Sequence, residues 1–105
     1  MLQYLHEHYQ EKFSLSKMAG TLNLSRGECS RYFHRSLGIT ISEYLLRYRL
    51  SISMQMLRQK TYSITEISMA AGFSSHSSYT EKFRKRTGMT PREYRKRSWE
   101  TGQMD

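Results

Sequence analysis

The sequence predicts an all-α fold of seven helices, in which two helix-turn-helix units are joined by a long linker helix. Apolar residues recur every three or four positions along most of the chain, as in amphipathic helices. Residues 14–38 also resemble residues 63–88, which indicates that one unit occurs twice. Finally, Ser or Thr is repeatedly followed by Glu three residues later, a pattern that begins helices. These capping pairs are Ser25 and Glu28, Thr40 and Glu43, Ser63 and Glu66, and Thr90 and Glu93.

The first unit is expected over residues 1–38 and contains three short helices. The first helix covers residues 2–11. Its apolar face consists of Leu2, Leu5 and Tyr9. Ser14 begins the second helix, and Asn23 ends it because asparagine tolerates the left-handed conformation. Its inward side chains are Leu15, Met18, Ala19 and Leu22. Ser25 begins the third helix, which a glycine stops. Its inward side chains are Cys29, Phe33 and Leu37.

The linker helix is expected over residues 40–59, where no Gly or Pro interrupts the pattern. One apolar stripe runs along it, formed by Ile41, Tyr44, Leu45, Tyr48, Ile52 and Met56. We expect this helix to fix the distance and the rotation between the two units.

The second unit is expected over residues 63–98. Ser63 caps its first helix, a second helix covers about residues 75–87, and Pro91 opens the last helix, since proline favours the first helical position. The inward side chains are Ile64, Ile67, Ala71, Tyr79 and Phe83. Residues 99–105 are expected to form a polar tail that frays.

The two units match at a nearly constant offset. Four residues recur 50 positions later, namely Gly38, Thr40, Glu43 and Tyr44 as Gly88, Thr90, Glu93 and Tyr94. Upstream the offset falls to 49, as from Ser25 to Ser74. One extra residue is therefore expected near the turn of the second unit. A short turn makes its two helices cross steeply, and the second helix of such a unit can lie in a DNA major groove.

The charge balance favours an anionic partner. Lys and Arg number 17 against 9 Asp and Glu, which gives a formal net charge of +8. Nucleic acid is the first candidate and an anionic membrane the second. No apolar run approaches the length of a membrane span. The single cysteine, Cys29, allows no internal disulfide, which fits a reducing cytoplasm.

The outward faces of the two second helices carry groups that can read base edges. In the first unit this face contains Gly27, Ser30, Arg31 and His34, with Arg26 leading. In the second it contains Ser77, Thr80, Glu81 and Arg84, with Ser75 and His76 leading. Arg31 can pair bidentately with guanine, and Glu81 can accept from cytosine.

Basic residues gather near the second of these helices. Eight of the 17 lie between Lys82 and Arg97, where only Glu93 opposes them. A solvated basic face is one interpretation, and contact with DNA phosphates is the other. The predicted phosphate contacts are Ser14, Ser25, His34, Arg35, Ser63, Ser75, Arg84, Lys85, Arg92 and Arg95.

Signature residues occur in both halves. The second half has the run from Ile64 to Phe73, then Ser77, Tyr79, Phe83, Gly88, Pro91 and Tyr94. The first half has Leu15, Met18, Ala19, Leu22, Ser25, Phe33, Gly38, Tyr44, Leu45 and Arg49. Over residues 1–98 this pattern resembles the DNA-binding domain of AraC/XylS-type transcription regulators, which is homeodomain-like.

The resemblance implies a cytoplasmic bacterial transcription regulator, typically an activator. Such a domain binds an asymmetric operator in double-stranded DNA, with both reading helices in successive major grooves. It also implies RNA polymerase as a further partner. Family members usually carry a separate effector or dimerisation domain, for which this chain has no room. The chain is therefore expected to be either the DNA-binding piece of a larger regulator or a stand-alone short member. Carried over by position, the base-reading residues are Arg26, Gly27, Ser30, Arg31, His76, Ser77, Thr80 and Glu81.

Two positions depart from the family pattern. Ser78 and Tyr79 stand where the family often has Tyr and Phe. Glu81 occupies a position that is often basic, and a carboxylate facing DNA would repel phosphate unless a specific base or a neighbour compensates.

An enzyme and a protein-interaction module are the alternatives. The sequence has no HExxH, no CxxC and no Gly-rich phosphate loop, so neither catalysis nor a cofactor is expected. A metal site is not expected either, because His6 and His8 do not share a helix face. An interaction module would expose an apolar groove, for example around Met54, Met56 and Met69.

Overall fold

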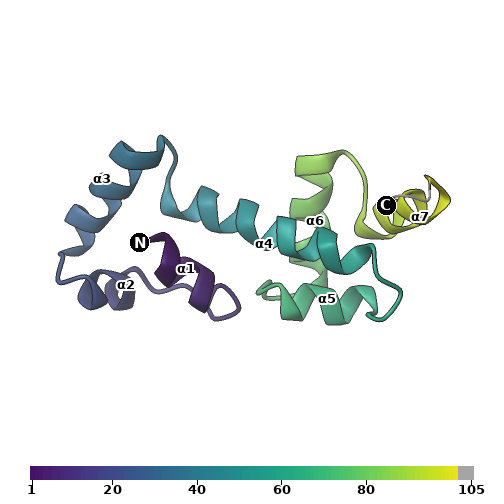
Figure 1. The fold of residues 1–105 in the computed structure, drawn as a ribbon, viewed down its shortest axis with the longest axis horizontal. Coiled ribbons are helices and arrows are strands. Elements are labelled where there is room, and N and C mark those ends of the chain that lie inside the picture. Colours follow the sequence, from purple (N-terminus) through teal and green to yellow (C-terminus); the bar gives the residue numbers. More distant parts are fainter. Residues whose placement is uncertain (102–105) are drawn as a thin grey trace. The chain divides into compact units, whose positions relative to one another are not determined.

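Seven α-helices and no strands make up residues 1–101, the part of the chain that this computed structural model describes (Figure 1). In chain order they are α1 (Leu2–His8), α2 (Leu15–Thr21), α3 (Arg26–Leu37), α4 (Ile41–Leu57), α5 (Ile64–Ala70), α6 (His76–Thr87) and α7 (Pro91–Thr101). The all-α prediction is confirmed. The chain divides into two structural units, Met1–Tyr48 and the part from Arg49 onward, so each unit owns one half of α4.

The predicted helix starts are confirmed. Reciprocal capping boxes form between Ser25 and Glu28, between Ser63 and Glu66, and between Thr90 and Glu93. The hydroxyl of Ser14 accepts from the N–H of Lys17 at 3.2 Å, and that of Thr40 accepts from the N–H of Glu43 at 3.1 Å. Each bond satisfies a backbone donor that the first turn of a helix leaves without a partner.

Left-handed residues end the helices of both units. Gly38 follows α3 with φ +77°, and Gly88 follows α6 with φ +84°. Asn23 has φ +58° beyond α2, as its side chain predicts. Two helix bounds differ from expectation. α1 ends at His8 instead of residue 11, and α7 continues to Thr101, past the expected boundary at residue 98. The rest of the predicted tail, residues 102–105, lies outside the described residues.

The core of the first unit joins α1, α2, α3 and the start of α4. Its buried members are Leu5, Met18, Ala19, Cys29, Phe33 and Ile41. Two residues predicted to face inward do not, because Leu2 is 37% exposed and Leu37 is 42% exposed. Leu2 is the first residue of α1 and Leu37 the last of α3. At these two helix ends the apolar pattern of the sequence therefore includes a residue that does not pack into the core.

The core of the second unit repeats this arrangement. Its buried apolar members are Leu50, Leu57, Ile67, Ala71, Phe73, Tyr79 and Phe83. Phe83 meets Tyr94 edge to face at 5.5 Å, just as Phe33 meets Tyr44 at 5.7 Å in the first unit. The two pairs stand 50 positions apart, so the repeat in the sequence is also a repeat in packing.

The single apolar stripe predicted for α4 is wrong in its second half. Ile41 and Leu45 are buried in the first unit, but Leu50, Ser53 and Leu57 are the buried residues of the second. The predicted members Ile52 and Met56 are only half-buried. Ser53 tolerates burial because its hydroxyl donates to the backbone oxygen of Leu50 at 2.7 Å.

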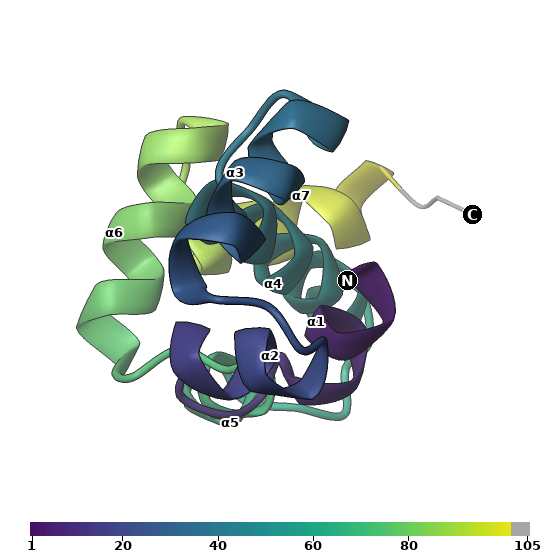
Figure 2. The same cartoon turned by 90° about the vertical axis from the view of Figure 1, so that its left-hand side faces the viewer.

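The extra residue lies in the turn of the second unit, as predicted. Helices α2 and α5 have 7 residues each and start 49 positions apart, whereas α3 and α6 have 12 each and start 50 apart. The expected match of Ser25 with Ser74 is wrong, because Ser75 is the residue whose hydroxyl accepts from the N–H of Ser78 at the start of α6. In Figures 1 and 2, α5 and α6 cross steeply, as a short turn requires.

Candidate nucleic-acid interface

Helix α3 presents its predicted reading face to solvent. Cys29 and Phe33 anchor the opposite side, with 0% and 1% of their surface exposed. Burial also raises the pKa of the Cys29 thiol. With these two residues inside, helical geometry turns the predicted readers outward. The exposed residues are Arg26, Gly27, Ser30, Arg31, His34 and Arg35.

Gly27 makes room for the side chain of Arg31. A Cβ added at Gly27 would lie 3.0 Å from Nη1 of Arg31, so the guanidinium lies over the glycine. Hydrogen bonds from Ser25, first from its backbone N–H and then from its side chain, lower the pKa of Glu28, and the charge of Arg31 adds to this effect. The guanidinium of Arg31 therefore lies back along the first turns of α3, over Gly27.

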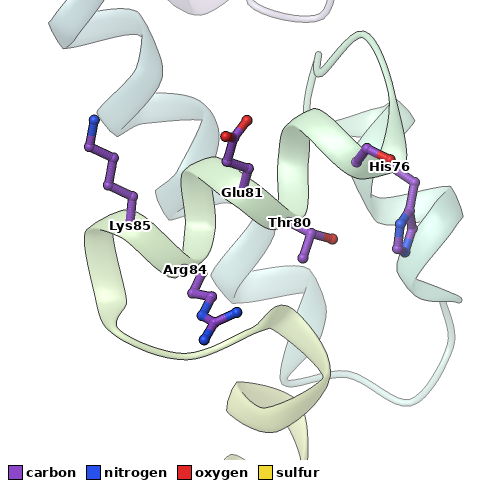
Figure 3. A pocket seen from close by; sticks show the side chains of 6 residues that line it. His76, Thr80, Glu81, Arg84 and Lys85 are labelled. Atoms are coloured by element: carbon purple, nitrogen blue, oxygen red, sulfur yellow. The ribbon is translucent and has the colours of Figure 1, made fainter.

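Helix α6 presents the equivalent face in the second unit. Tyr79 and Phe83 are fully buried on its inner side. Six outer residues line one open hollow, namely His76, Ser77, Thr80, Glu81, Arg84 and Lys85. In Figure 3, Glu81 and Lys85 project from one side of α6 and Arg84 from the other. The predicted reading residues of this unit therefore share one surface.

Two members of this surface have unusual environments. Thr80 is half-buried, and its hydroxyl oxygen is covered by protein without a hydrogen-bond partner among residues 1–101. Glu81 is exposed and lines the same hollow as Arg84 and Lys85. The carboxylate of Glu81 projects from the same side of α6 as Lys85 (Figure 3).

The predicted phosphate contacts are mostly exposed. The hydroxyls of Ser14, Ser25, Ser63 and Ser75 accept from backbone N–H groups and thus sit at helix N-termini, where anions bind favourably. The cationic side chains of Arg35, Arg84, Lys85 and Arg92 are exposed, as is His34. These groups are available to an anionic partner.

Arg95 differs from the other predicted phosphate contacts. Its Nε donates to the backbone oxygen of Leu57 at 3.0 Å, and its Nη2 donates to that of Gln59 at 3.2 Å. The guanidinium also lies 5.3 Å from the ring centroid of Trp99, and burial lowers its pKa. Arg95 thus satisfies carbonyls at the C-terminus of α4 and holds α7 against it. Sequence reasoning missed this role.

Tyr79 replaces an expected phenylalanine in the core beneath α6. Its ring lies 4.8 Å from that of Phe73 and 5.7 Å from that of Phe83. Its hydroxyl is buried. Burial raises the pKa of Tyr79 to about 12, against smaller lowering effects from Ser53 and Arg95. The hydroxyl therefore stays neutral and packs as part of the core.

No cluster of three or more His, Cys, Asp or Glu side chains that could hold a metal ion occurs in residues 1–101. No helix in that range has the length and apolar character needed to cross a membrane. Met69 is 60% exposed, whereas Met54 and Met56 are half-buried, so these three do not form one exposed apolar face.

Known proteins share this sequence and this architecture. A family model described as "Helix-turn-helix domain" matches residues 18–97. The HTH-type transcriptional regulator YdeC of Bacillus subtilis is 41% identical over 96 residues, which cover 91% of this chain and 33% of that protein. This chain spans about a third of the length of the curated relatives that it matches.

Two solved structures extend the similarity to the fold. An AraC-type transcriptional regulator from Chromobacterium violaceum superposes with a TM-score of 0.84 at 32% identity, covering 96% of this chain and 90% of that one. The DNA-binding domain of the global transcriptional factor AdpA, in complex with a target DNA, superposes with a TM-score of 0.85 at 26% identity. That match covers 91% of this chain and 86% of the AdpA chain.

Proposed function

The chain belongs to the AraC-type helix-turn-helix family of transcription regulators, and from this premise we propose that it binds a specific double-stranded DNA sequence through α3 and α6. One observation carries the proposal. In each unit the helix after the turn buries one aromatic face and exposes, on the other, hydroxyl, imidazole, guanidinium or carboxylate groups. Such groups match the donors and acceptors of the major groove. The family consists of transcription regulators and not of enzymes.

The two reading faces differ at every matched position. At the offset of 50, the α3 residues Arg26, Gly27, Ser30 and Arg31 correspond to the α6 residues His76, Ser77, Thr80 and Glu81. The cationic Arg31 of the first unit thus corresponds in sequence to the anionic Glu81 of the second. Two units with different chemistry read two different half-sites, so we propose an asymmetric operator read in successive major grooves.

Phosphate contacts position the domain without reading sequence. We assign this role to the exposed side chains of His34, Arg35, Arg84 and Lys85 on α3 and α6, and of Arg92 on α7. Capped helix N-termini at Ser14, Ser25, Ser63 and Ser75 add backbone N–H groups. Arg95 is left out, because its Nε and Nη2 donate to the backbone oxygens of Leu57 and Gln59.

Further partners follow from the family. We propose that the protein acts in the bacterial cytoplasm, where the chromosome lies, and that it contacts RNA polymerase there. We also propose that the parent protein carries an effector or dimerisation domain. Supporting this, the curated relatives are about three times as long as the region that this chain matches.

A matched pair of variants on α3 tests the proposal. Arg31→Ala should weaken binding by roughly 1–3 kcal/mol on the preferred site and relax the preference at one base position. Arg35→Ala, also an exposed arginine on α3, should weaken binding to all duplexes equally and reduce the salt slope by about 0.9. Fluorescence anisotropy at several salt concentrations measures both effects.

The outcomes separate base reading from phosphate contact. An equal loss on every sequence for Arg31→Ala would make Arg31 a phosphate contact. A wild-type chain that binds all duplexes alike, with an affinity that only fades as salt rises, would contradict sequence-specific binding by this domain.

A further inference from the structure

We infer that Thr80 reads a thymine through its methyl group, and not a base edge through its hydroxyl. This inference rests on the proposed function, which places α6 in a major groove. It names the base and the chemical group that Thr80 contacts. The hydroxyl of a threonine would ordinarily be expected to form a hydrogen bond with a base edge, whereas here the methyl group makes the contact.

The burial of the two branches of the side chain carries the inference. Thr80 lines the open hollow on α6 together with His76, Glu81 and Arg84. The residue is half-buried, so part of its surface is exposed. Its hydroxyl oxygen has essentially no exposed surface and no hydrogen-bond partner. The part of the side chain that faces the hollow is therefore hydrocarbon. Figure 3 shows the two branches, oxygen and methyl, pointing in different directions from α6.

A methyl group at this place has one natural counterpart in DNA. The C5 methyl of thymine is the apolar group that a base pair presents in the major groove, and the methyl of threonine is among the groups that contact it. The neighbours on the hollow are a carboxylate, a guanidinium, an ammonium and an imidazole, which suit polar edges instead. Thr80 thus supplies the apolar contact of this surface.

The first unit lacks this contact. The residue that matches Thr80 on α3 is Ser30, which is exposed and has no methyl group. Reading of a thymine methyl is therefore expected only in the half-site of α6. This difference provides an internal control within the same duplex.

The test removes one chemical group from the DNA base or from the side chain of Thr80 and compares the binding affinities. The DNA is the preferred duplex from a selection with the wild-type chain, with deoxyuridine replacing one thymidine at a time, which removes only the methyl. The proteins are the wild type, Thr80→Val, which keeps a methyl, and Thr80→Ser, which keeps the hydroxyl. Melting curves confirm that each variant folds. Thr80→Val should fold at least as well, since it replaces a buried hydroxyl that has no partner.

One deoxyuridine position in the α6 half-site should weaken wild-type binding about fourfold, the effect expected for one buried methyl group. Thr80→Val should bind like the wild type and keep this discrimination. Thr80→Ser should lose about the same factor on the thymidine duplex and no longer distinguish the two bases.

Three results would overturn the inference. Strong binding by Thr80→Ser with weak binding by Thr80→Val would show that the hydroxyl turns outward and reads the base. No discrimination between thymidine and deoxyuridine in the α6 half-site would show that no methyl contact exists. If the wild-type chain selects no preferred sequence, both the inference and the proposed function are contradicted. This outcome is recognised at the selection step, before any Thr80 variant is compared.

Discussion

Arg95 shows how one side chain can satisfy a charge pattern and still serve a different purpose. It is one of the eight basic residues between Lys82 and Arg97, a pattern that predicts contact with an anion. Its guanidinium instead donates to two carbonyls at the end of α4 and stacks against Trp99. Lys60 lies 5.1 Å from the same ring, and the indole N–H of Trp99 approaches the backbone oxygen of Arg58. The role of Arg95 therefore follows from the groups that its guanidinium contacts, and its positive charge alone did not predict it.

Arg95→Ala should therefore destabilise the second unit. The loss of two charged hydrogen bonds at a partly buried site is expected to lower the free energy of unfolding by about 1–3 kcal/mol. Arg97→Ala, an exposed residue of the same helix, is the matched control and should stay within about 0.5 kcal/mol of the wild type. Urea unfolding measures both. Equal stabilities for the two variants would remove Arg95 from the α4 contact.

Two capping carboxylates predict a decline of stability in acid. Backbone hydrogen bonds from Ser25 and Thr90 lower the pKa of Glu28 and of Glu93 below the ordinary value of 4.5. The unfolded chain then binds more protons than the folded one, so their contribution is complete above that value and is lost as the pH falls through the folded pKa. Urea unfolding between pH 6 and pH 3 should show this loss. Glu28→Gln with Glu93→Gln keeps an acceptor and should make the decline shallower, whereas an unchanged decline would assign it to other groups.

At the scale of the element, helix ends carry most of the local information. The same substitution should have opposite signs at two glycines. Gly38 has φ +77°, so Gly38→Ala is expected to cost about 1–2 kcal/mol. Gly20 lies inside α2, and an added Cβ would meet no atom within 4 Å apart from its chain neighbours and the backbone of its own helix, so Gly20→Ala should stabilise by about 0.5–1 kcal/mol. Thermal unfolding of the two variants compares them directly, and a loss at both positions would contradict this description of α2.

These ends are also where the sequence predicts best. A capping box joins residues only three positions apart, so Ser25 with Glu28 and Ser63 with Glu66 were predictable without a fold. Contacts over long separations were not. Arg95 donates to the backbone oxygen of Leu57, which lies 38 positions earlier in the sequence. Ser53 is a polar residue and was therefore not predicted to be buried, but its hydroxyl donates to the backbone oxygen of Leu50 within the packed core. The reading faces were predictable as faces, but the covered hydroxyl of Thr80 required the packed structure.

At the scale of the whole molecule, α4 belongs to both units. Their boundary falls between Tyr48 and Arg49, inside the helix. Inserting one alanine after Tyr48 leaves the spacing between the buried residues of α4 unchanged within each unit. An insertion after Ser53 would instead separate Leu50 and Ser53 from Leu57 and disturb the second core.

The alanine after Tyr48 should leave both units folded and abolish binding to the operator, because it rotates one unit by roughly 100° about the helix axis. Melting curves and anisotropy on the selected duplex separate the two effects. Full affinity in a folded insertion variant would mean that the two units bind independently of the length of α4.

The most direct test of double reading is the selection of binding sites from random duplex DNA, followed by hydroxyl-radical footprinting of the winner. Two different short motifs separated by about one helical turn, roughly 10 base pairs, and protected on one face of the duplex are the predicted result. Arg31→Ala should then relax the first motif alone, and Glu81→Ala the second alone. A single motif that responds to variants of only one helix would contradict the central claim that both α3 and α6 read sequence.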